Sequence, residues 1–203
     1  MLPFVHPFTC IVSGPTGSGK TDFVMRVIDN ADALFEPTPA KIVYYFGEYQ
    51  PLFDRYAGVD FRHGMPKAGE IDKLADALVV FDDMMADIDE RVTNLFTRGS
   101  HNQNVSAILM VQNFFDKNKH MRTISLNAQY IVLFKNPRDN SQFAHLAKQL
   151  YPHNGRFAHE AFIDATAEPY GYLLLDLRNE QDEDLRLRTH IFPGKRQLVY
   201  VPK

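Results

Sequence analysis

One segment near the start of the chain has the residue types and the spacing that hold a nucleotide polyphosphate. It reads Gly14-Pro15-Thr16-Gly17-Ser18-Gly19-Lys20-Thr21, which is the pattern G-x-x-x-x-G-K-[ST]. The glycines let successive backbone N–H groups turn inward around an anion, Lys20 reaches the β- and γ-phosphates, and the Thr21 hydroxyl ligates Mg²⁺. An apolar run at 8–12 precedes the segment and an amphipathic stretch follows it, so the phosphates would meet a helix N-terminus. These residues predict a site for ATP and Mg²⁺.

Two carboxylates follow a second apolar run. Leu78–Phe81 is typical of a strand buried on both faces of a parallel sheet, and Asp82 and Asp83 come directly after it. Asp82 is placed to hold Mg²⁺ through water, and Asp83 is the candidate base that orients the attacking water. The alternative is that the pair only caps the helix that follows.

The run 107–111 ends in a similar way, with Gln112 and Asn113 after it. A neutral amide both donates to a γ-phosphate oxygen and accepts from water. Gln112 is therefore predicted to report which nucleotide is bound. Strands commonly end in Asn or Gln, so this prediction depends on the two motifs above.

The elements that must position these residues alternate along the chain. Expected strands lie at 8–12, 41–45, 78–81, 107–111, 130–134, 172–175 and 198–201, with an edge strand at 59–61. Expected helices lie at 21–30, 88–97 and 139–151, the last begun by Asp139 and Gln142 as a capping box, with short helical turns at 51–56 and 70–74. The alternation predicts an α/β fold with a mostly parallel sheet sandwiched between helices, which places ligands at the carboxyl ends of the strands.

Size and composition indicate that residues 1–203 form a single domain, because 45% of the chain is apolar and no composition shift divides it. No apolar run is long enough to span a membrane, and the first residues lack the basic start of a signal peptide, so we expect an intracellular protein without a membrane span. The single cysteine, Cys10, lies in an expected buried strand and is interpreted as a small core residue.

A formal charge of −3 argues against a monomer that coats nucleic acid electrostatically, although a ring touching DNA with a few residues per subunit is compatible with it. Basic residues gather in two sets, the first being Lys117, Lys119, His120 and Arg122 and the second Arg186, Arg188, Lys195 and Arg196. Each set is either an ordinary solvated face or a contact with DNA phosphates.

The order of motifs resembles that of the poxvirus-type genome-packaging ATPases of the HerA/FtsK superfamily, which occur in large DNA viruses and in virus-like transposons of the Maverick/Polinton kind. The segments that carry the resemblance are the phosphate loop, Val79–Asp83, Leu95–His101, Leu109–Asn113, Met121–Ala128 and Val132–Asp139. They span roughly residues 8–152, with a fainter echo at 188–194. Many NTPases share the nucleotide motifs, so Thr97–His101 and Phe134–Asp139 are the specific part.

This resemblance implies a RecA-like core in which the strand ending at Gln112 lies between the phosphate-loop strand and the Asp82 strand. It also implies a homo-oligomeric ring that drives double-stranded DNA into a preformed capsid, with capsid or portal vertex proteins as partners, inside the infected host cell at assembling virions. One departure concerns Asp83, because the superfamily usually has Glu there. Aspartate is one methylene shorter, so Glu48, at the end of the second expected strand, is the reserve candidate for the base.

Arg98 lies at the end of the expected helix 88–97 and would project from the subunit edge. A guanidinium there is a candidate finger for a neighbour's γ-phosphate, a contribution worth about 10³ to 10⁵ in rate in other NTPases. The alternative is a surface arginine paired with Asp87 or Glu90. The rival arginines are Arg91, Arg122 and Arg138.

Two other functions stay open at this point. A nucleotide or nucleoside kinase also carries a phosphate loop, although it needs an acceptor pocket and usually an Arg-rich lid, and no such run is visible. A nucleotide-gated assembly protein would bind ATP with little turnover.

Overall fold

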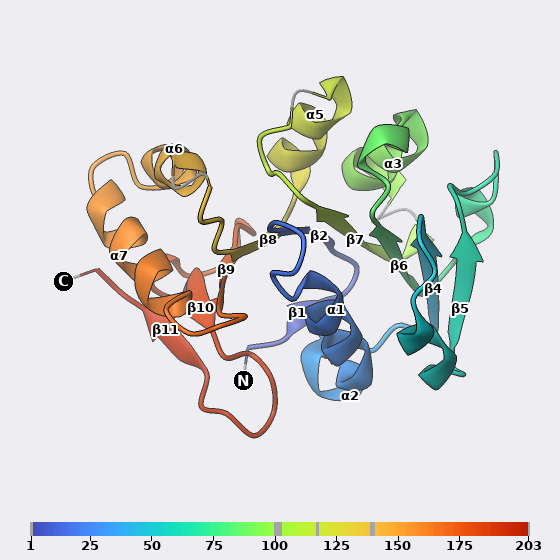
Figure 1. Ribbon diagram of the computed structural model, residues 1–203, viewed down its shortest axis with the longest axis horizontal. Helices are drawn as coiled ribbons and strands as arrows, with labels where there is room; N and C mark the ends of the chain where they lie inside the picture. Colours follow the sequence, from blue (N-terminus) through green and yellow to red (C-terminus); the bar gives the residue numbers. More distant parts are fainter. Residues whose placement is uncertain (1, 100–102, 117, 139–140, 203) are drawn as a thin grey trace.

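The computed structural model describes residues 2–99, 103–116, 118–138 and 141–202 of the chain. Within these ranges, nine strands form one sheet in the order β11-β10-β9-β8-β2-β7-β6-β4-β5 (Figure 1). Their bounds are β2 Thr9–Ser13, β4 Lys41–Phe46, β5 Val59–His63, β6 Ala77–Asp82, β7 Val105–Val111, β8 Tyr130–Phe134, β9 Tyr172–Asp176, β10 Leu187–Thr189 and β11 Leu198–Tyr200. A short parallel pair, β1 (Phe4–Val5) and β3 (Phe35–Glu36), lies apart from this sheet.

The six strands from β8 to β5 are parallel, and β9, β10 and β11 extend the sheet antiparallel. The predicted mostly parallel α/β fold is thus confirmed, and 59–61 lies in the edge strand β5 as expected. The change of direction after β8 has a simple cause. Helices α6 and α7 follow β8 and bring the chain back to the carboxyl end of β8, where β9 begins. A connection to a parallel strand would instead cross the sheet once and begin at its opposite edge.

Helices cover both faces of the sheet (Figure 1). One side carries α1 (Lys20–Asp29) and α2 (Ala31–Leu34), and the other carries α3 (Glu90–Asn94), α5 (Lys119–Asn127), α6 (Ser141–Leu150) and α7 (Gly155–Ala165). Short helical turns are η1 Pro51–Arg55, η2 Ile71–Lys73, η3 Met85–Asp87 and η5 Glu183–Leu185, and η4 (Leu95–Gly99) is a π-helical turn. Successive side chains of a strand point to opposite faces, so Ile11 packs in the α3–α7 layer and Val12 in the α1 layer.

The expected helix at 88–97 is shorter and less regular than its periodicity predicts. Its apolar residues Ile88, Val92, Leu95 and Phe96 are buried as expected. However, Asp89 accepts a hydrogen bond from Arg91 N at 2.8 Å and begins α3 there, and the chain widens into the π-helical turn after Asn94. The capping residue expected at Asp139 lies outside the described residues, and the described part of that helix begins at Ser141.

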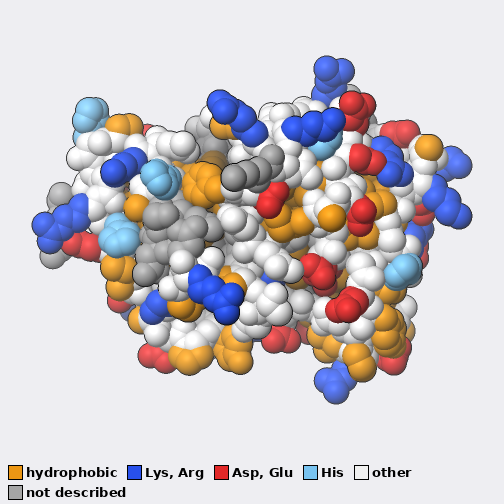
Figure 2. Space-filling model, turned by 45° about the horizontal axis from the view of Figure 1, so that its top comes forward, with side chains coloured by type: hydrophobic (Ala, Val, Ile, Leu, Met, Phe, Trp, Pro, Cys, Tyr) orange, Lys and Arg blue, Asp and Glu red, His pale blue; other side chains and the backbone are white. Residues whose placement is uncertain are grey.

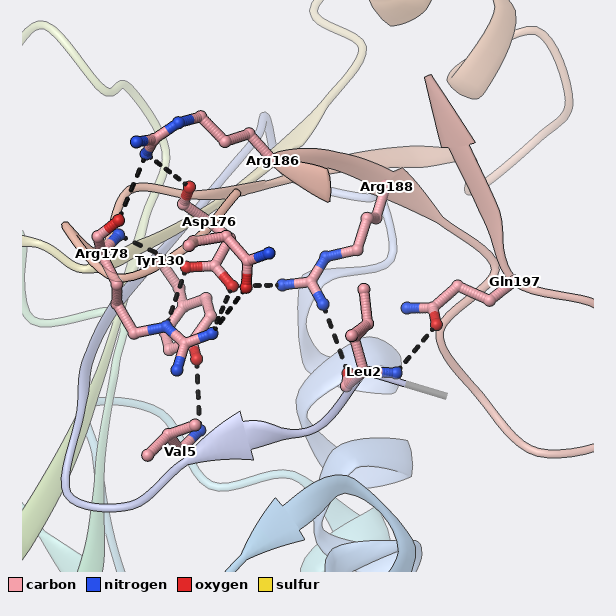
Figure 3. Close-up of polar contacts among 9 residues, drawn as sticks. Leu2, Val5, Tyr130, Asp176, Arg178, Arg186, Arg188 and Gln197 are labelled. Carbon is pink, nitrogen blue, oxygen red and sulfur yellow. Dashed lines mark hydrogen bonds and ion pairs between the residues drawn. The ribbon is translucent and has the colours of Figure 1, made fainter. Parts of the chain in front are cut away.

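The second basic set divides in two: Arg186 and Arg188 bond to Asp176 in the sheet (Figure 3), whereas Lys195 and Arg196 are exposed. Arg188 is 1% exposed, and its Nη2 lies 2.6 Å from Oδ2 of Asp176, which is also buried. Nη1 of Arg186 donates to the Asp176 carbonyl oxygen at 3.1 Å. Arg188 also reaches the carbonyl oxygen of Leu2 at 3.4 Å, so the pair ties β9 and β10 to the start of the chain. The interpretation of Arg188 as solvated or DNA-facing is therefore wrong, whereas Arg186 stays partly exposed.

Candidate nucleotide site

The glycine-rich loop joins the end of β2 to the start of α1, at the carboxyl edge of the parallel strands (Figure 1). Gly14 N donates to the carbonyl oxygen of Val111 at 3.1 Å, which fixes the loop beside β7. Gly17 and Gly19 have φ values of 78° and 97°, a region that favours glycine. A Cβ on Gly14 would lie 2.7 Å from that of Phe134, so a side chain there would collide with β8. The backbone therefore has the shape that the pattern predicts.

Lys20 begins α1 and folds back across the loop. Its Nζ donates to the carbonyl oxygens of Gly14 at 2.6 Å and Pro15 at 3.1 Å. Burial lowers the pKa of Lys20, while the negative charges of Asp82 and Asp83 act to raise it. The ammonium group thus lies within electrostatic reach of both carboxylates that the sequence placed on the next motif.

The loop holds a polar atom that a bound phosphate would satisfy. Ser18 Oγ is buried and has no hydrogen-bond partner among the described residues. A buried hydroxyl left unpaired costs about 1–3 kcal/mol, so such atoms are rare unless a ligand pairs with them. Together with the Lys20 ammonium and the N-terminus of α1, this atom makes the loop chemically suited to a polyphosphate.

Asp82 ends β6 and is 6% exposed. Its Oδ2 accepts a hydrogen bond from the Tyr44 hydroxyl at 2.8 Å. Burial raises the pKa of Asp82, and the nearby charge of Asp83 acts in the same direction, whereas the Tyr44 bond and Lys20 act to lower it. Tyr44 is fully buried in β4, and no sequence pattern points to its role, because a tyrosine within the apolar run 41–46 is typical of an ordinary core residue.

Asp83 and Gln112 meet in the structure as the sequence motifs suggest. Gln112 Nε2 donates to Asp83 Oδ1 at 3.1 Å, and both side chains are exposed at the edge of the sheet. Strand β7 lies between β2 and β6, which confirms the expected place of the Gln112 strand. Asp83 has a φ of 55°, a left-handed conformation that non-glycine residues adopt rarely and that clusters at functional sites.

Glu48, the reserve candidate for the base, follows Gly47 at the end of β4. Gly47 N donates to the Asp82 carbonyl oxygen at 3.1 Å, and a Cβ on Gly47 would lie 2.9 Å from the carbonyl oxygen of Asp83. The glycine therefore lets β4 approach the two carboxylates closely. Glu48 itself is exposed, and within the described parts of the chain it has no hydrogen bond or ion pair with Asp83 or Gln112.

A divalent cation fits this edge if the nucleotide supplies part of its coordination. Thr21 in the first turn of α1 and Asp82 are the residues of the expected Mg²⁺ site. No three His, Cys, Asp or Glu side chains come together as metal ligands in the ranges that the structure covers. Magnesium commonly uses one or two protein oxygens together with phosphate oxygens and waters, so this small donor set is compatible with it.

Arg98 lies far from the loop of its own chain. It is exposed at the end of η4 and lines a surface pocket with Asp72 and Gln103, which precede β6 and β7. The pocket is therefore near the amino ends of these strands, opposite the phosphate loop. The described residues show no ion pair of Arg98, with Asp87 and Glu90 included.

The rival arginines differ in whether their guanidinium groups are already paired within the chain. Arg91 forms an ion pair with Asp89, with Nη2 and Oδ2 2.5 Å apart, and donates to the Pro66 carbonyl oxygen. Arg122 is exposed on α5, and Arg138 is exposed after β8, at the same edge of the sheet as the loop.

The first basic set keeps two exposed charges on α5. Lys119 and Arg122 are exposed, whereas His120 Nδ1 lies 3.0 Å from Thr93 Oγ1 and so contacts α3. Lys117 lies outside the described residues. On the face shown in Figure 2, Lys and Arg side chains lie mostly toward the rim, and Asp and Glu side chains gather right of the centre. This distribution favours local phosphate contacts over a continuous basic surface.

None of the helices described is long and apolar enough to cross a membrane. No protein-family model matches the chain. No curated protein matches it either.

Solved structures do match. The chain is similar to the genome packaging NTPase B204 from Sulfolobus turreted icosahedral virus 2 in complex with sulfate, with a TM-score of 0.59, 12% identity and 97% of each chain covered. The complexes of the same protein with ATP-gammaS and with AMPPCP both match with a TM-score of 0.57 and 12% identity, over 97% of this chain and 97% and 98% of B204. At this identity the likeness establishes the fold, which is that of a RecA-like P-loop NTPase.

Proposed function

We propose that this chain is an ATPase whose hydrolysis of ATP moves double-stranded DNA into a viral capsid. The observation that carries the proposal is the hydrogen bond between Gln112 and Asp83 at the sheet edge that also carries the phosphate loop with Lys20 and the buried Asp82. A phosphate cradle alone would serve binding, but a carboxylate and an amide joined to each other beside the cradle also suit hydrolysis. The packaging role is supported by the sequence resemblance and by a fold shared with B204 over nearly the whole length of both chains.

Each residue has a defined part in the proposed reaction. The loop N–H groups and Lys20 hold the β- and γ-phosphates, and Thr21 and Asp82 hold Mg²⁺. When bound, Mg²⁺ offsets the negative charge on the phosphate oxygens. Asp83 orients a water whose oxygen attacks the γ-phosphorus, and the bond to the oxygen bridging the β- and γ-phosphates breaks. The products are ADP and inorganic phosphate, and the proton of the water passes to Asp83 and then to solvent.

Gln112 has two partners in this scheme. Its Nε2 donates to Asp83 in the structure, so the amide keeps the carboxylate in place. When a γ-phosphate is present, the same N–H group can donate to it instead, which would link the state of the nucleotide to the position of β7. Gln112 therefore acts as the proposed sensor, and Glu48 remains the reserve base.

The remaining parts of the proposal concern assembly. Arg98 lies away from its own loop, so a role at a γ-phosphate requires a neighbouring subunit, as in a homo-oligomeric ring. Lys119 and Arg122 on α5 are the proposed contacts with DNA phosphates. Capsid or portal vertex proteins would be the other partners, in the infected host cell where virions assemble.

Phosphate release with and without double-stranded DNA tests the proposal. The motor predicts ATP hydrolysis that DNA stimulates and that Lys20→Ala abolishes, because the variant lacks the charge that neutralises the transferred phosphate. ADP formation that depends on a nucleoside or nucleotide acceptor would show a kinase instead. Tight ATP binding without turnover in either condition would show a nucleotide-gated assembly protein.

A further inference from the structure

The turn that leads into β9 carries a tyrosine in an unusual conformation. Tyr170 has a φ of 61°, and its side chain is 69% exposed. A bulky residue with positive φ is strained, and such strain persists only where the surrounding backbone imposes it. Here Gly171 N donates to the carbonyl oxygen of Glu168 at 3.0 Å, and a Cβ on Gly171 would lie 2.6 Å from the carbonyl oxygen of Ala165. The tight turn therefore holds an exposed aromatic ring in a fixed place.

That place is the phosphate loop. The Cδ1 atom of Tyr170 lies 2.8 Å from the position that a Cβ on Gly19 would occupy, so only glycine at 19 leaves room for the ring. Gly19 is the residue at which α1 begins to form, with a φ of 97°. In the register of β8 and β9, Tyr172 pairs with Phe134, the last residue of β8. Tyr170 thus extends beyond the carboxyl end of β8, at the sheet edge where the loop lies.

The orientation of a bound nucleotide in the site follows from the strand order. Asp82, Asp83 and Gln112 follow β6 and β7, which lie on one side of the loop strand β2. Asp83 and Gln112, joined to each other there, are the residues proposed to act at the γ-phosphate, so the terminal phosphate belongs on that side. The nucleoside must then leave the loop on the opposite side, toward β8 and β9. Tyr170 is the exposed aromatic residue that β9 brings to this side of the loop.

We propose that Tyr170 is the stacking platform for the base of the bound nucleotide. The inference rests on the proposed function, because it assumes a nucleotide in the loop, and it adds the residue that binds the nucleoside. Every base presents a π-face, so an aromatic ring in this place supplies affinity with little choice between bases. The strained turn keeps the ring in position before the nucleotide arrives, which lowers the entropy lost on binding.

The test compares ATP with inorganic tripolyphosphate, which has the phosphates but no base, by calorimetry. Tyr170→Ala should weaken ATP binding by about 5- to 150-fold, the range for loss of one base stack. It should leave tripolyphosphate binding unchanged, and Tyr170→Phe should bind ATP like the wild type. Ile163→Ala is the matched control, because Ile163 is an exposed apolar residue (56%) on the preceding helix α7.

A second measurement uses the absence of tryptophan from the chain. Tyr170→Trp introduces a single tryptophan, which can be excited apart from the tyrosines and whose emission ATP and GTP should both quench and tripolyphosphate should not. Equal effects of the two kinds of ligand, or no effect of Tyr170→Ala on ATP affinity, would overturn the assignment while leaving hydrolysis untouched. Conversely, ATP binding that depends on Tyr170 without DNA-stimulated hydrolysis would support base stacking on Tyr170 and would contradict the proposed DNA-translocating function.

Discussion

Replacing Tyr44 with phenylalanine should lower the free energy of unfolding by an amount that depends on pH. The change removes one hydroxyl and keeps the ring in its fully buried place in β4. In the wild type this hydroxyl donates to Asp82 Oδ2 at 2.8 Å, and Asp82 is only 6% exposed. Burial already raises the pKa of Asp82, and the Tyr44 bond is the main opposing contact, so its loss raises that pKa further.

The magnitude follows from the two charge states of Asp82. A hydrogen bond to a charged group contributes about 1.5–3 kcal/mol, and one between neutral groups about 0.5–1.5 kcal/mol. Tyr44→Phe should therefore cost about 1.5–3 kcal/mol when Asp82 is ionised and about 0.5–1.5 kcal/mol when it is protonated. Burial beside Asp82 raises the pKa of Tyr44, so its hydroxyl remains a donor throughout.

The sign of the pH dependence is fixed by linkage. Because the pKa of Asp82 is higher in the folded chain than in the unfolded one, the folded chain holds this proton to higher pH, and the stability from this group falls as pH rises through the folded value. In Tyr44→Phe the pKa of Asp82 in the folded chain is higher still than in the wild type. The deficit of this variant relative to the wild type should accordingly grow from acid to neutral pH.

Urea unfolding from about pH 4.5 to about pH 8 measures this deficit. Asp82→Asn provides the control background, because an amide cannot ionise and the cost of Tyr44→Phe should there be the same at every pH. A cost that does not vary with pH in the wild-type background, or that still varies in Asp82→Asn, would refute the proposed coupling between these two residues.

Three further predictions concern the site and its partners. Asp83→Asn should bind ATP normally but release no phosphate above background, because its amide cannot accept a proton; normal turnover would move the base to another residue. Neutralising Lys119 and Arg122 together should flatten the salt dependence of DNA binding by about two counterion contacts, measured by titration at several salt concentrations, and an unaltered slope would make them solvated charges. Arg98→Ala subunits should bind ATP but be inactive alone, and mixing them with Lys20→Ala subunits should restore some hydrolysis; no recovery in rings shown to be mixed would exclude Arg98 as a finger in trans.

The parallel half of the sheet could be predicted because its sequence is locally explicit. Continuous apolar runs ending in polar residues predict buried parallel strands, and β2, β6 and β7 lie within a residue or two of their expected bounds. Asp83 and Gln112 were each expected near the nucleotide because carboxyl ends of parallel strands share one edge, and the hydrogen bond between them is a finding of the structure. The motifs at the carboxyl ends of these strands therefore made the position of the site predictable.

The other half depends on contacts that no local pattern shows. The fully buried residues of helix α7 are the alanines Ala158, Ala161 and Ala165, and its larger Phe157 and Phe162 pack against the core only half-buried, so the helix carries a weaker apolar signal than one with large buried residues. Arg188 sits in a short strand and reads as a surface charge until Asp176, on the neighbouring antiparallel strand, neutralises it. A buried charge of this kind requires its partner in three dimensions, which a sequence pattern does not specify.

Tyr44 and Tyr170 were missed as site residues for the same reason: each contacts the site through residues far away in the sequence. The bond of Tyr44 to Asp82 joins positions 38 residues apart. Tyr170 lies 151 positions after Gly19 and meets it only because β9 pairs with β8 beside the loop. Both tyrosines became candidates through register and strand order, which tertiary packing decides.

ATP-driven displacement of a third strand from a DNA triplex would show directly whether this chain moves along DNA, because a protein that moves along duplex DNA strips off the third strand ahead of it. We expect displacement by the wild-type chain with ATP, and none by the wild type with a non-hydrolysed ATP analogue or by Asp83→Asn with ATP, although nucleotide and DNA should still bind in both cases. Wild-type protein that hydrolyses ATP on duplex DNA and leaves the triplex intact would contradict the proposal that this chain is a DNA-translocating motor.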